Sequence, residues 1–252
     1  MRRAFTLFEL VMALLVIALL VSVLLKYSSA SRESAYDAQC KSNLRELAQA
    51  CIRYAMDKGE FPWGLKTVEG YSSYCWDFVK RTDSSAWEPG EMWQGYKASS
   101  VVCCPKCRAE NDNWDSCGFT GYNYNCAYVG KVEGDPGARS KPLRWWRVGC
   151  AERLLLFGDA GYAGGMNKFM RAPVSDALND ASASGLREAG TQAFRHKGHA
   201  NLAFADGHVE SCSTPYRVGG GPGFVDKKTK TAFVDKDNTL YGGCRGDCGI
   251  IP

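Results

Sequence analysis

The first 58 residues contain neither glycine nor proline, although the whole chain of 252 residues has 27 glycines and 9 prolines. Because these two residues weaken a helix most, the stretch can form one uninterrupted helix that Gly59 and Pro62 bring to an end. About fifty residues at 1.5 Å each give a rod of roughly 75 Å, far longer than the helix of an average globular domain. Such a rod suits lateral packing into a bundle or filament.

The first half of this helix is apolar. The segment from Phe5 to Leu25 has 21 residues, and about 31 Å of helix is close to the hydrocarbon thickness of a bilayer. We therefore predict a transmembrane helix over 5–25. Its one carboxylate, Glu9, lies near the start. An unpaired charge at the centre of a span costs on the order of 2.5 to 3.5 kcal/mol, and less near the end, so Glu9 is expected to have a partner.

The second half of the helix, residues 26–58, is amphipathic. Charged side chains mostly lie on one face, which predicts that the other face packs on a globular head. Six residues recur at helical spacing on the apolar face: Leu44, Leu47, Ala48, Cys51, Tyr54 and Ala55.

The N-terminus resembles the type IV prepilin signal: the basic leader Arg2-Arg3-Ala4 is followed by Phe5-Thr6-Leu7-Phe8-Glu9. The resemblance implies that residues 1–4 are a leader, that a prepilin peptidase cuts between Ala4 and Phe5, and that Phe5 is then N-methylated. It also implies that Glu9 pairs with the terminal amine of a neighbouring subunit during filament assembly. Ala4 stands where the family usually has glycine.

Two other interpretations of the N-terminus remain open. An ordinary secretory signal would be cleaved after Ser28-Ser29-Ala30, and a plain signal-anchor helix would not be cleaved at all. In the prepilin interpretation the arginines of the leader stay in the cytoplasm. The expected protein is then a single-pass inner-membrane protein with its head in the periplasm or outside the cell.

Residues 59–252 are expected to form one head of loops and short strands. We predict strands at Leu154 to Phe157, Asn201 to Ala205, His208 to Cys212 and Gly121 to Val129. The dipeptide Asp206-Gly207 favours a type I′ hairpin turn. The predicted fold is therefore α+β and pilin-like: a long N-terminal helix packed on a small antiparallel β-sheet head.

The far end of the chain resembles the same prepilin-type group. His196 precedes Asp206-Gly207 by nine intervening residues, which is the H-X9-DG pattern of many such proteins. Three further segments resemble the group: residues 40–45, Cys104-Pro105 and residues 154–159. The resemblance implies a subunit of a type IV pilus or of a type II secretion-like pseudopilus, whether major or minor.

The three histidines lie within thirteen residues of sequence. His196, His199 and His208, with Asp206, are candidate ligands for zinc. The alternative is structural: Asp206-Gly207 forms a turn, and His196 makes a hydrogen bond to the strand backbone.

The chain has twelve cysteines. In a head outside the cytoplasm they favour disulfides, with a structural zinc site and unpaired buried thiols as alternatives. The candidates for either a disulfide or zinc are Cys103, Cys104, Cys107, Cys117, Cys126, Cys244 and Cys248.

Other chemistry is weakly indicated. Asp235, Asp237 and Asn238 offer oxygen ligands for calcium, but the spacing departs from an EF-hand loop. Residues 139–147 alternate basic residues with aromatic residues, yet packing explains this pattern as well as nucleic-acid binding does.

The net charge of +4 falls to +2 when the two leader arginines are removed, which gives no support to a polyanionic partner. No common catalytic motif is present, so we expect a protein that is not an enzyme.

Two hypotheses follow. The first is a pilin-like structural subunit whose partners are the prepilin peptidase, other pilin-like subunits and the inner membrane. The second is a membrane-anchored binding or metal-dependent module that uses the N-terminal helix only as an anchor.

Overall fold

The computed structural model describes residues 6–93, 95, 101–109, 119–135, 141–161, 167–176 and 184–242. Its longest element is helix α1, Leu7–Lys58, of 52 residues. The helix begins at a capping box between Thr6 and Glu9 and ends at Gly59, whose φ of 74° is left-handed. The predicted uninterrupted helix is confirmed.

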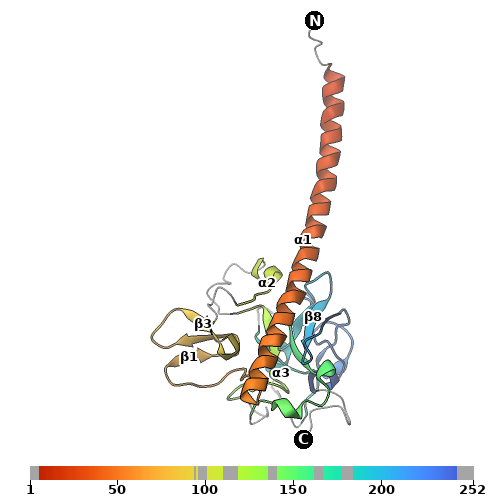
Figure 1. Ribbon diagram of the computed structural model, residues 1–252. Coiled ribbons are helices and arrows are strands. Elements are labelled where there is room, and N and C mark those ends of the chain that lie inside the picture. Colours follow the sequence, from red (N-terminus) through yellow and green to blue (C-terminus); the bar gives the residue numbers. More distant parts are fainter. Residues whose placement is uncertain are drawn as a thin grey trace.

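The two halves of α1 have different surroundings. From Leu7 to Leu25 the helix extends away from the head (Figure 1), and its side chains are exposed on all sides, as at Leu19 with 65% and Leu25 with 67%. Among the described residues, α1 is the one helix long and apolar enough to cross a membrane. The second half packs into the head as the apolar spacing predicts. Its buried residues are Cys40, Leu44, Leu47, Ala48, Ala50, Cys51 and Ala55.

The sheet that receives α1 has five strands in the order β6-β4-β5-β8-β9. Four neighbouring pairs join these strands; three of the pairs are antiparallel, and β4 pairs with β6 in parallel. Helix α1 contacts β5, β8 and β9. In chain order the strands are β4 Tyr122–Asn125, β5 Leu155–Asp159, β6 Phe169–Met170, β8 Ala200–Phe204 and β9 Val209–Cys212. The α+β fold class is confirmed, and each of the four predicted strands corresponds to one of these, with β4 shorter than expected.

Two smaller sheets complete the described part of the head. A three-stranded antiparallel sheet lies to one side of α1 (Figure 1) and consists of β1 Tyr71–Tyr74, β2 Phe78–Arg81 and β3 Trp87–Pro89. Strands β7 Gln192–Ala193 and β10 Thr231–Ala232 form the other sheet. The short helices are α2 Pro105–Ala109, α3 Ser184–Ala189 and α4 Thr239–Gly242, with 3-10 turns at Glu91–Trp93, Trp145–Arg147, Ala151–Arg153 and Val218–Gly220.

The turn between β8 and β9 differs from the predicted type I′. A type I′ turn needs positive φ at both central residues, but of this dipeptide only Gly207 has it, with φ 89°. The Gly207 N–H donates to the Phe204 carbonyl at 2.9 Å, so the tight turn closes one residue earlier than expected. In this kind of hairpin loop, a type I turn is followed by a glycine in the left-handed region. The Asp206 side chain then accepts a hydrogen bond from the His208 backbone N–H at 3.0 Å.

A carboxylate joins α1 to the three-stranded side of the head. Glu91 accepts hydrogen bonds from the Tyr54 hydroxyl of α1 at 2.7 Å and from the Tyr74 hydroxyl of β1 at 3.1 Å. It also forms an ion pair with Lys66. Burial opposes ionisation of Glu91, but the hydrogen bonds from Lys66 and Tyr54 outweigh burial and lower its pKa.

This shift predicts a pH dependence of stability. A carboxylate whose pKa is lower in the folded state stabilises the fold above its unfolded pKa, and the contribution is lost as the pH falls through the folded pKa. We expect Glu91→Gln to reduce the free energy of unfolding by about 1 to 3 kcal/mol at neutral pH. The difference from wild type should shrink below about pH 4. Denaturant unfolding of both proteins over this pH range measures it.

Glu69→Gln is the matched control, since Glu69 is exposed and its replacement should leave unfolding unchanged. A difference between wild type and Glu91→Gln that stays constant down to pH 3 would contradict the role given to the Glu91 charge.

Candidate metal centre in the head

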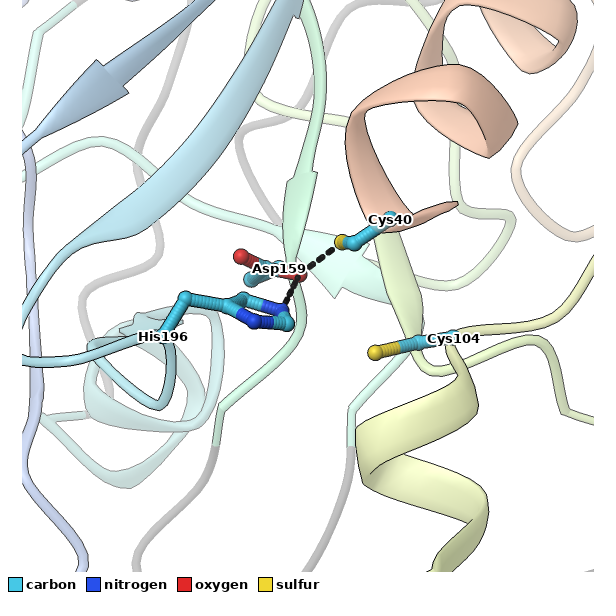
Figure 2. A group of neighbouring side chains, drawn as sticks. All are labelled: Cys40, Cys104, Asp159 and His196. Carbon is cyan, nitrogen blue, oxygen red and sulfur yellow. Dashed lines mark hydrogen bonds and ion pairs between the residues drawn. The ribbon is translucent and has the colours of Figure 1, made fainter. Parts of the chain in front are cut away.

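Four donor side chains from distant parts of the chain converge beneath α1: Cys40, Cys104, Asp159 and His196 (Figure 2). Their donor atoms all lie within 4.8 Å of one another. Each of the four residues has 0% of its surface exposed. We refer to these four residues as the donor cluster.

A different element positions each member. Cys40 lies on the buried face of α1, and Asp159 is the last residue of β5. Cys104 immediately precedes α2, where the Cys107 backbone N–H points at its sulfur at 3.5 Å. His196 opens the tight turn between β7 and β8, in which His196 and His199 exchange both backbone hydrogen bonds, at 3.1 and 3.2 Å. Residue 197 of this turn is left-handed, with φ 52°.

Within the donor cluster, the polar atoms face one another. The Cys40 thiol donates to Asp159 Oδ1 at 3.1 Å, and His196 Nε2 is 3.6 Å from the same oxygen. The other oxygen, Oδ2, is occupied, because it accepts the Asn201 backbone N–H at 2.7 Å. Neither ring nitrogen of His196 has a hydrogen-bond partner, although both are buried.

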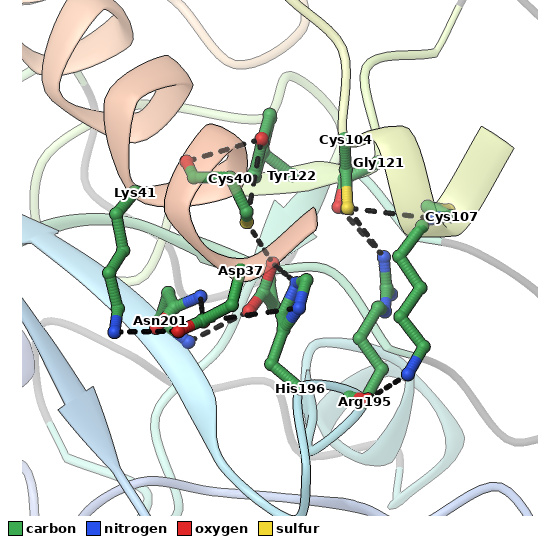
Figure 3. Close-up of polar contacts among 12 residues, drawn as sticks. Asp37, Cys40, Lys41, Cys104, Cys107, Gly121, Tyr122, Arg195, His196 and Asn201 are labelled. Atoms are coloured by element: carbon green, nitrogen blue, oxygen red, sulfur yellow. Dashed lines mark hydrogen bonds and ion pairs between the residues drawn. The ribbon is translucent and has the colours of Figure 1, made fainter. Parts of the chain in front are cut away.

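A ring of polar groups surrounds the donor cluster (Figure 3). The Tyr122 hydroxyl donates to Cys40 Sγ at 3.5 Å, and Arg195 Nη1 donates to Cys104 Sγ at 3.6 Å. On the far side of the imidazole, Asp37 Oδ1 is 4.0 Å from His196 Nδ1. Asp37 itself is held by Lys41 at 2.9 Å and by Asn201 Nδ2 at 2.9 Å.

The surroundings shift the pKa values of the two thiols in opposite directions. Burial disfavours a thiolate at Cys104, but the Cys40 hydrogen bond and the Arg195 charge outweigh it and hold the pKa of Cys104 well below its usual value. Burial raises the pKa of Cys40, and the neighbouring Cys104 and Asp159 raise it further. These opposite shifts favour a thiolate at Cys104 over one at Cys40.

The two remaining members form an ion pair. Burial alone would lower the pKa of His196, but interaction with Asp159 and Cys104 raises it to about 9. Burial alone would raise the pKa of Asp159, but the neighbouring His196 and Arg195 charges and the Asn201 backbone hydrogen bond outweigh it and lower the pKa. Without a metal, the donor cluster is thus held together by a buried imidazolium and its carboxylate.

Of the predicted histidine site, only His196 belongs to the donor cluster. His199 Nε2 is 3.0 Å from Asp37 Oδ1, and His208 Nδ1 is 2.6 Å from Asp206 Oδ1 at the exposed β8–β9 turn. The structure therefore divides His196, His199, His208 and Asp206 among three surroundings. Of the alternative expectation, the turn at Asp206-Gly207 is observed. The hydrogen bonds of His196 are those of its backbone with His199, and its ring nitrogens make none to a strand backbone.

Six of the described cysteines are free thiols, so the disulfides expected from the cysteine count do not form at these positions: Cys40, Cys51, Cys75, Cys104, Cys126 and Cys212. Three predicted candidates, Cys117, Cys244 and Cys248, lie outside the described residues, as does the cleavage junction Ala4–Phe5.

The residues suggested for calcium serve a local role. Asp235 Oδ2 accepts the Leu240 N–H at 3.0 Å, and Asp237 Oδ1 accepts the Thr239 N–H at 2.9 Å, so both carboxylates cap α4. Asn238 Oδ1 accepts a hydrogen bond from the Val174 backbone N–H at 3.0 Å. Within the segment suggested for nucleic acid, Arg144 stacks over the Trp146 ring at 5.2 Å.

Comparison with known proteins gives no relative: no protein-family model, no curated protein and no solved structure matches the chain.

All four members of the donor cluster lie in short segments that already stand out in the sequence. Cys40, Cys104 and Asp159 lie in the segments 40–45, Cys104-Pro105 and 154–159, and His196 opens the H-X9-DG pattern. Each of these segments carries one side chain that can bind a metal. The presence of one such side chain in each of the four segments is the signal from which the site could have been predicted.

Chemically, the arrangement suits metal binding better than nucleophilic catalysis. A cysteine nucleophile must reach its substrate, whereas all four side chains are buried. A catalytic histidine also uses one nitrogen for the nucleophile and the other for the carboxylate. Here Nδ1 is 4.0 Å from Asp37 Oδ1, too far for the hydrogen bond that would orient a catalytic histidine.

The burial of these thiols predicts their reactivity. Alkylation of the native, metal-free protein should modify the partly exposed Cys212 well before the buried Cys40 and Cys104. After unfolding without reductant, all three should be modified, because none is in a disulfide. Peptide mass mapping at successive times measures both results. Rapid native labelling of Cys104 would contradict the burial of the cluster.

Proposed function

We propose that the protein is a pilin-like structural subunit that is processed by a prepilin peptidase and assembles through α1 into a filament of the type IV pilus or type II secretion kind. Its mechanism is assembly rather than turnover. The inner membrane holds α1 before assembly, and the head lies outside the cytoplasm.

One observation carries this proposal: a single helix is exposed and apolar in its first half and buried in a β-sheet head in its second. The exposed side chains surround the helix rather than forming one stripe, as at Leu14, Leu15, Val16 and Ile17, all more than half exposed. A helix that is apolar on all sides needs an apolar surrounding on all sides. A bilayer supplies one before assembly, and the helices of neighbouring subunits supply another in a filament.

Glu9 fits a second role besides assembly. Its carboxylate accepts from the Thr6 backbone N–H at 2.9 Å and from the Thr6 hydroxyl at 2.8 Å, while the Glu9 N–H donates to Thr6 Oγ1 at 3.2 Å. This capping box satisfies the helix terminus of one subunit. We assign the negative charge that remains to the terminal amine of a neighbouring subunit, as the prepilin resemblance implies.

The N-terminus of the mature protein tests the proposal. In cells that contain a prepilin peptidase, we expect the purified protein to begin at N-methylated Phe5, which intact mass and N-terminal sequencing both detect. Retention of Met1, or cleavage after Ala30, would overturn the proposal and favour the anchor or secretory interpretation.

Substitutions at Glu9 separate its charge from its capping role. Glutamine at the third position of a helix can still complete a capping box, so Glu9→Gln removes the charge alone. We expect Glu9→Gln and Glu9→Val to insert into the membrane normally but to enter sheared filaments less by roughly tenfold or more, the effect of about 1.4 kcal/mol. Immunoblots of membrane and filament fractions measure the ratio.

Thr6→Ala is the control for the cap, because it removes the capping hydroxyl and keeps the charge. It should enter filaments like the wild type, provided that sequencing shows normal cleavage. Normal assembly of Glu9→Gln would show that the Glu9 charge has no part in assembly. A loss in Thr6→Ala would show that the cap is needed as well.

A further inference from the structure

We propose that Cys40, Cys104, Asp159 and His196 bind one structural zinc ion, which fastens the rod helix α1 to the head. This inference goes beyond the filament function and does not depend on it. It rests on the residues of the donor cluster and on the groups that surround them.

The donor set has the composition of a closed zinc site. Two cysteine sulfurs, one imidazole nitrogen and one carboxylate oxygen supply the four ligands of a tetrahedron. Thiolate ligands favour zinc over magnesium or calcium, which prefer oxygen. With four protein ligands no position is left for water or substrate, so the ion has a structural rather than catalytic role.

The spacing of the donors is close to the required geometry. Metal–ligand bonds of about 2.0 to 2.3 Å place tetrahedral ligands about 3.3 to 3.8 Å apart. The separation of His196 Nε2 from Asp159 Oδ1 is 3.6 Å, and that of Cys40 Sγ from the same oxygen is 3.1 Å. Every pair lies within 4.8 Å, so contraction by about an ångström closes the shell.

His196 supplies the independent observation. Its side chain is fully buried, and neither ring nitrogen makes a hydrogen bond. Buried polar groups almost always have a partner, because leaving one unpaired is costly. Nε2 is the nitrogen that faces Asp159 Oδ1 and the two sulfurs, so an ion at the centre of the cluster would satisfy it.

The surrounding groups orient the ligands as outer partners do in metal sites. The Asn201 N–H occupies Oδ2 of Asp159 and leaves Oδ1 facing the cluster. The Cys107 N–H and Arg195 point at Cys104 Sγ. Asp37 lies on the Nδ1 side of His196, where a carboxylate commonly fixes the tautomer of a metal-bound histidine.

The charges also balance. Two thiolates and a carboxylate around a divalent cation leave one net negative charge. Arg195 lies 3.6 Å from Cys104 Sγ and neutralises that charge. Binding displaces one proton from Cys40 and one from His196 to solvent, since zinc takes a thiolate and a neutral imidazole.

The position of the site gives it a mechanical purpose. Its ligands come from α1, from the segment before α2, from the end of β5 and from the turn after β7. One ion therefore ties the helix to three separate parts of the head.

The test measures zinc in the full-length protein, purified in detergent with a tag that contains no histidine. After equilibration with zinc chloride and dialysis, elemental analysis should give one zinc per chain in the wild type. Cys40→Ala and His196→Ala should lose it. Cys51→Ala is the matched control, because Cys51 is equally buried on the same helix and outside the cluster.

Two further measurements distinguish the loss of a zinc ligand from misfolding of the variants. Cobalt added to the metal-free wild type should give thiolate-to-cobalt charge-transfer absorption, which Cys51→Ala retains and Cys40→Ala weakens. A chelator should lower the unfolding temperature of the wild type and leave that of Cys40→Ala unchanged. The proposal is overturned if the wild type retains no zinc, if Cys40→Ala retains as much as wild type, or if a Cys40–Cys104 disulfide is found.

Discussion

The packing of α1 on the five-stranded sheet is the interaction on which the rest of the head depends, because the sheet has no other long helix among the described residues to cover it. Leu44, Leu47 and Cys51 are fully buried at this interface. The same helix contributes Cys40 to the donor cluster and, on the three-stranded side, Tyr54 to Glu91. Removing the helix would thus expose an apolar surface and leave the donor cluster and the partly buried Glu91 each without one of their partners.

The sequence predicts the parts of this structure that local rules determine. The absence of glycine and proline and the spacing of Leu44, Leu47 and Cys51 are enough for the helix and its buried face. Strands β5 and β8 follow from short apolar runs, and β9 from the turn signal Asp206-Gly207 that precedes it. The three-stranded sheet at residues 71–89 was not predicted strand by strand, because its segments have no clean alternation and their pairing is a matter of tertiary context.

The donor cluster could not be predicted by spacing, for a different reason. Its members lie 64, 55 and 37 residues apart along the chain, so only the packing of α1, β5 and the turn after β7 brings them together. The histidines that are close in sequence were the more obvious candidates. They separate because a tight turn directs His196 into the core, while His199 lies at the edge of α1 and His208 on an exposed hairpin.

The place where α1 leaves the head determines how far the head stands from the membrane in the proposed function. Among the described residues, the contacts of the head with the helix that lie nearest its N-terminus are at Glu33, which pairs with Lys106, and at Ser34, which accepts from Lys197 Nζ at 2.8 Å. The 26 residues from Leu7 to residue 32 precede these contacts and have a length of about 39 Å. A hydrocarbon layer takes up about 30 Å of that length, and the remainder is about the depth of one headgroup layer. The head would therefore rest directly on the lipid surface, with Lys106 and Lys197 at the level of the phosphates, and extraction into a filament would have to break that contact first.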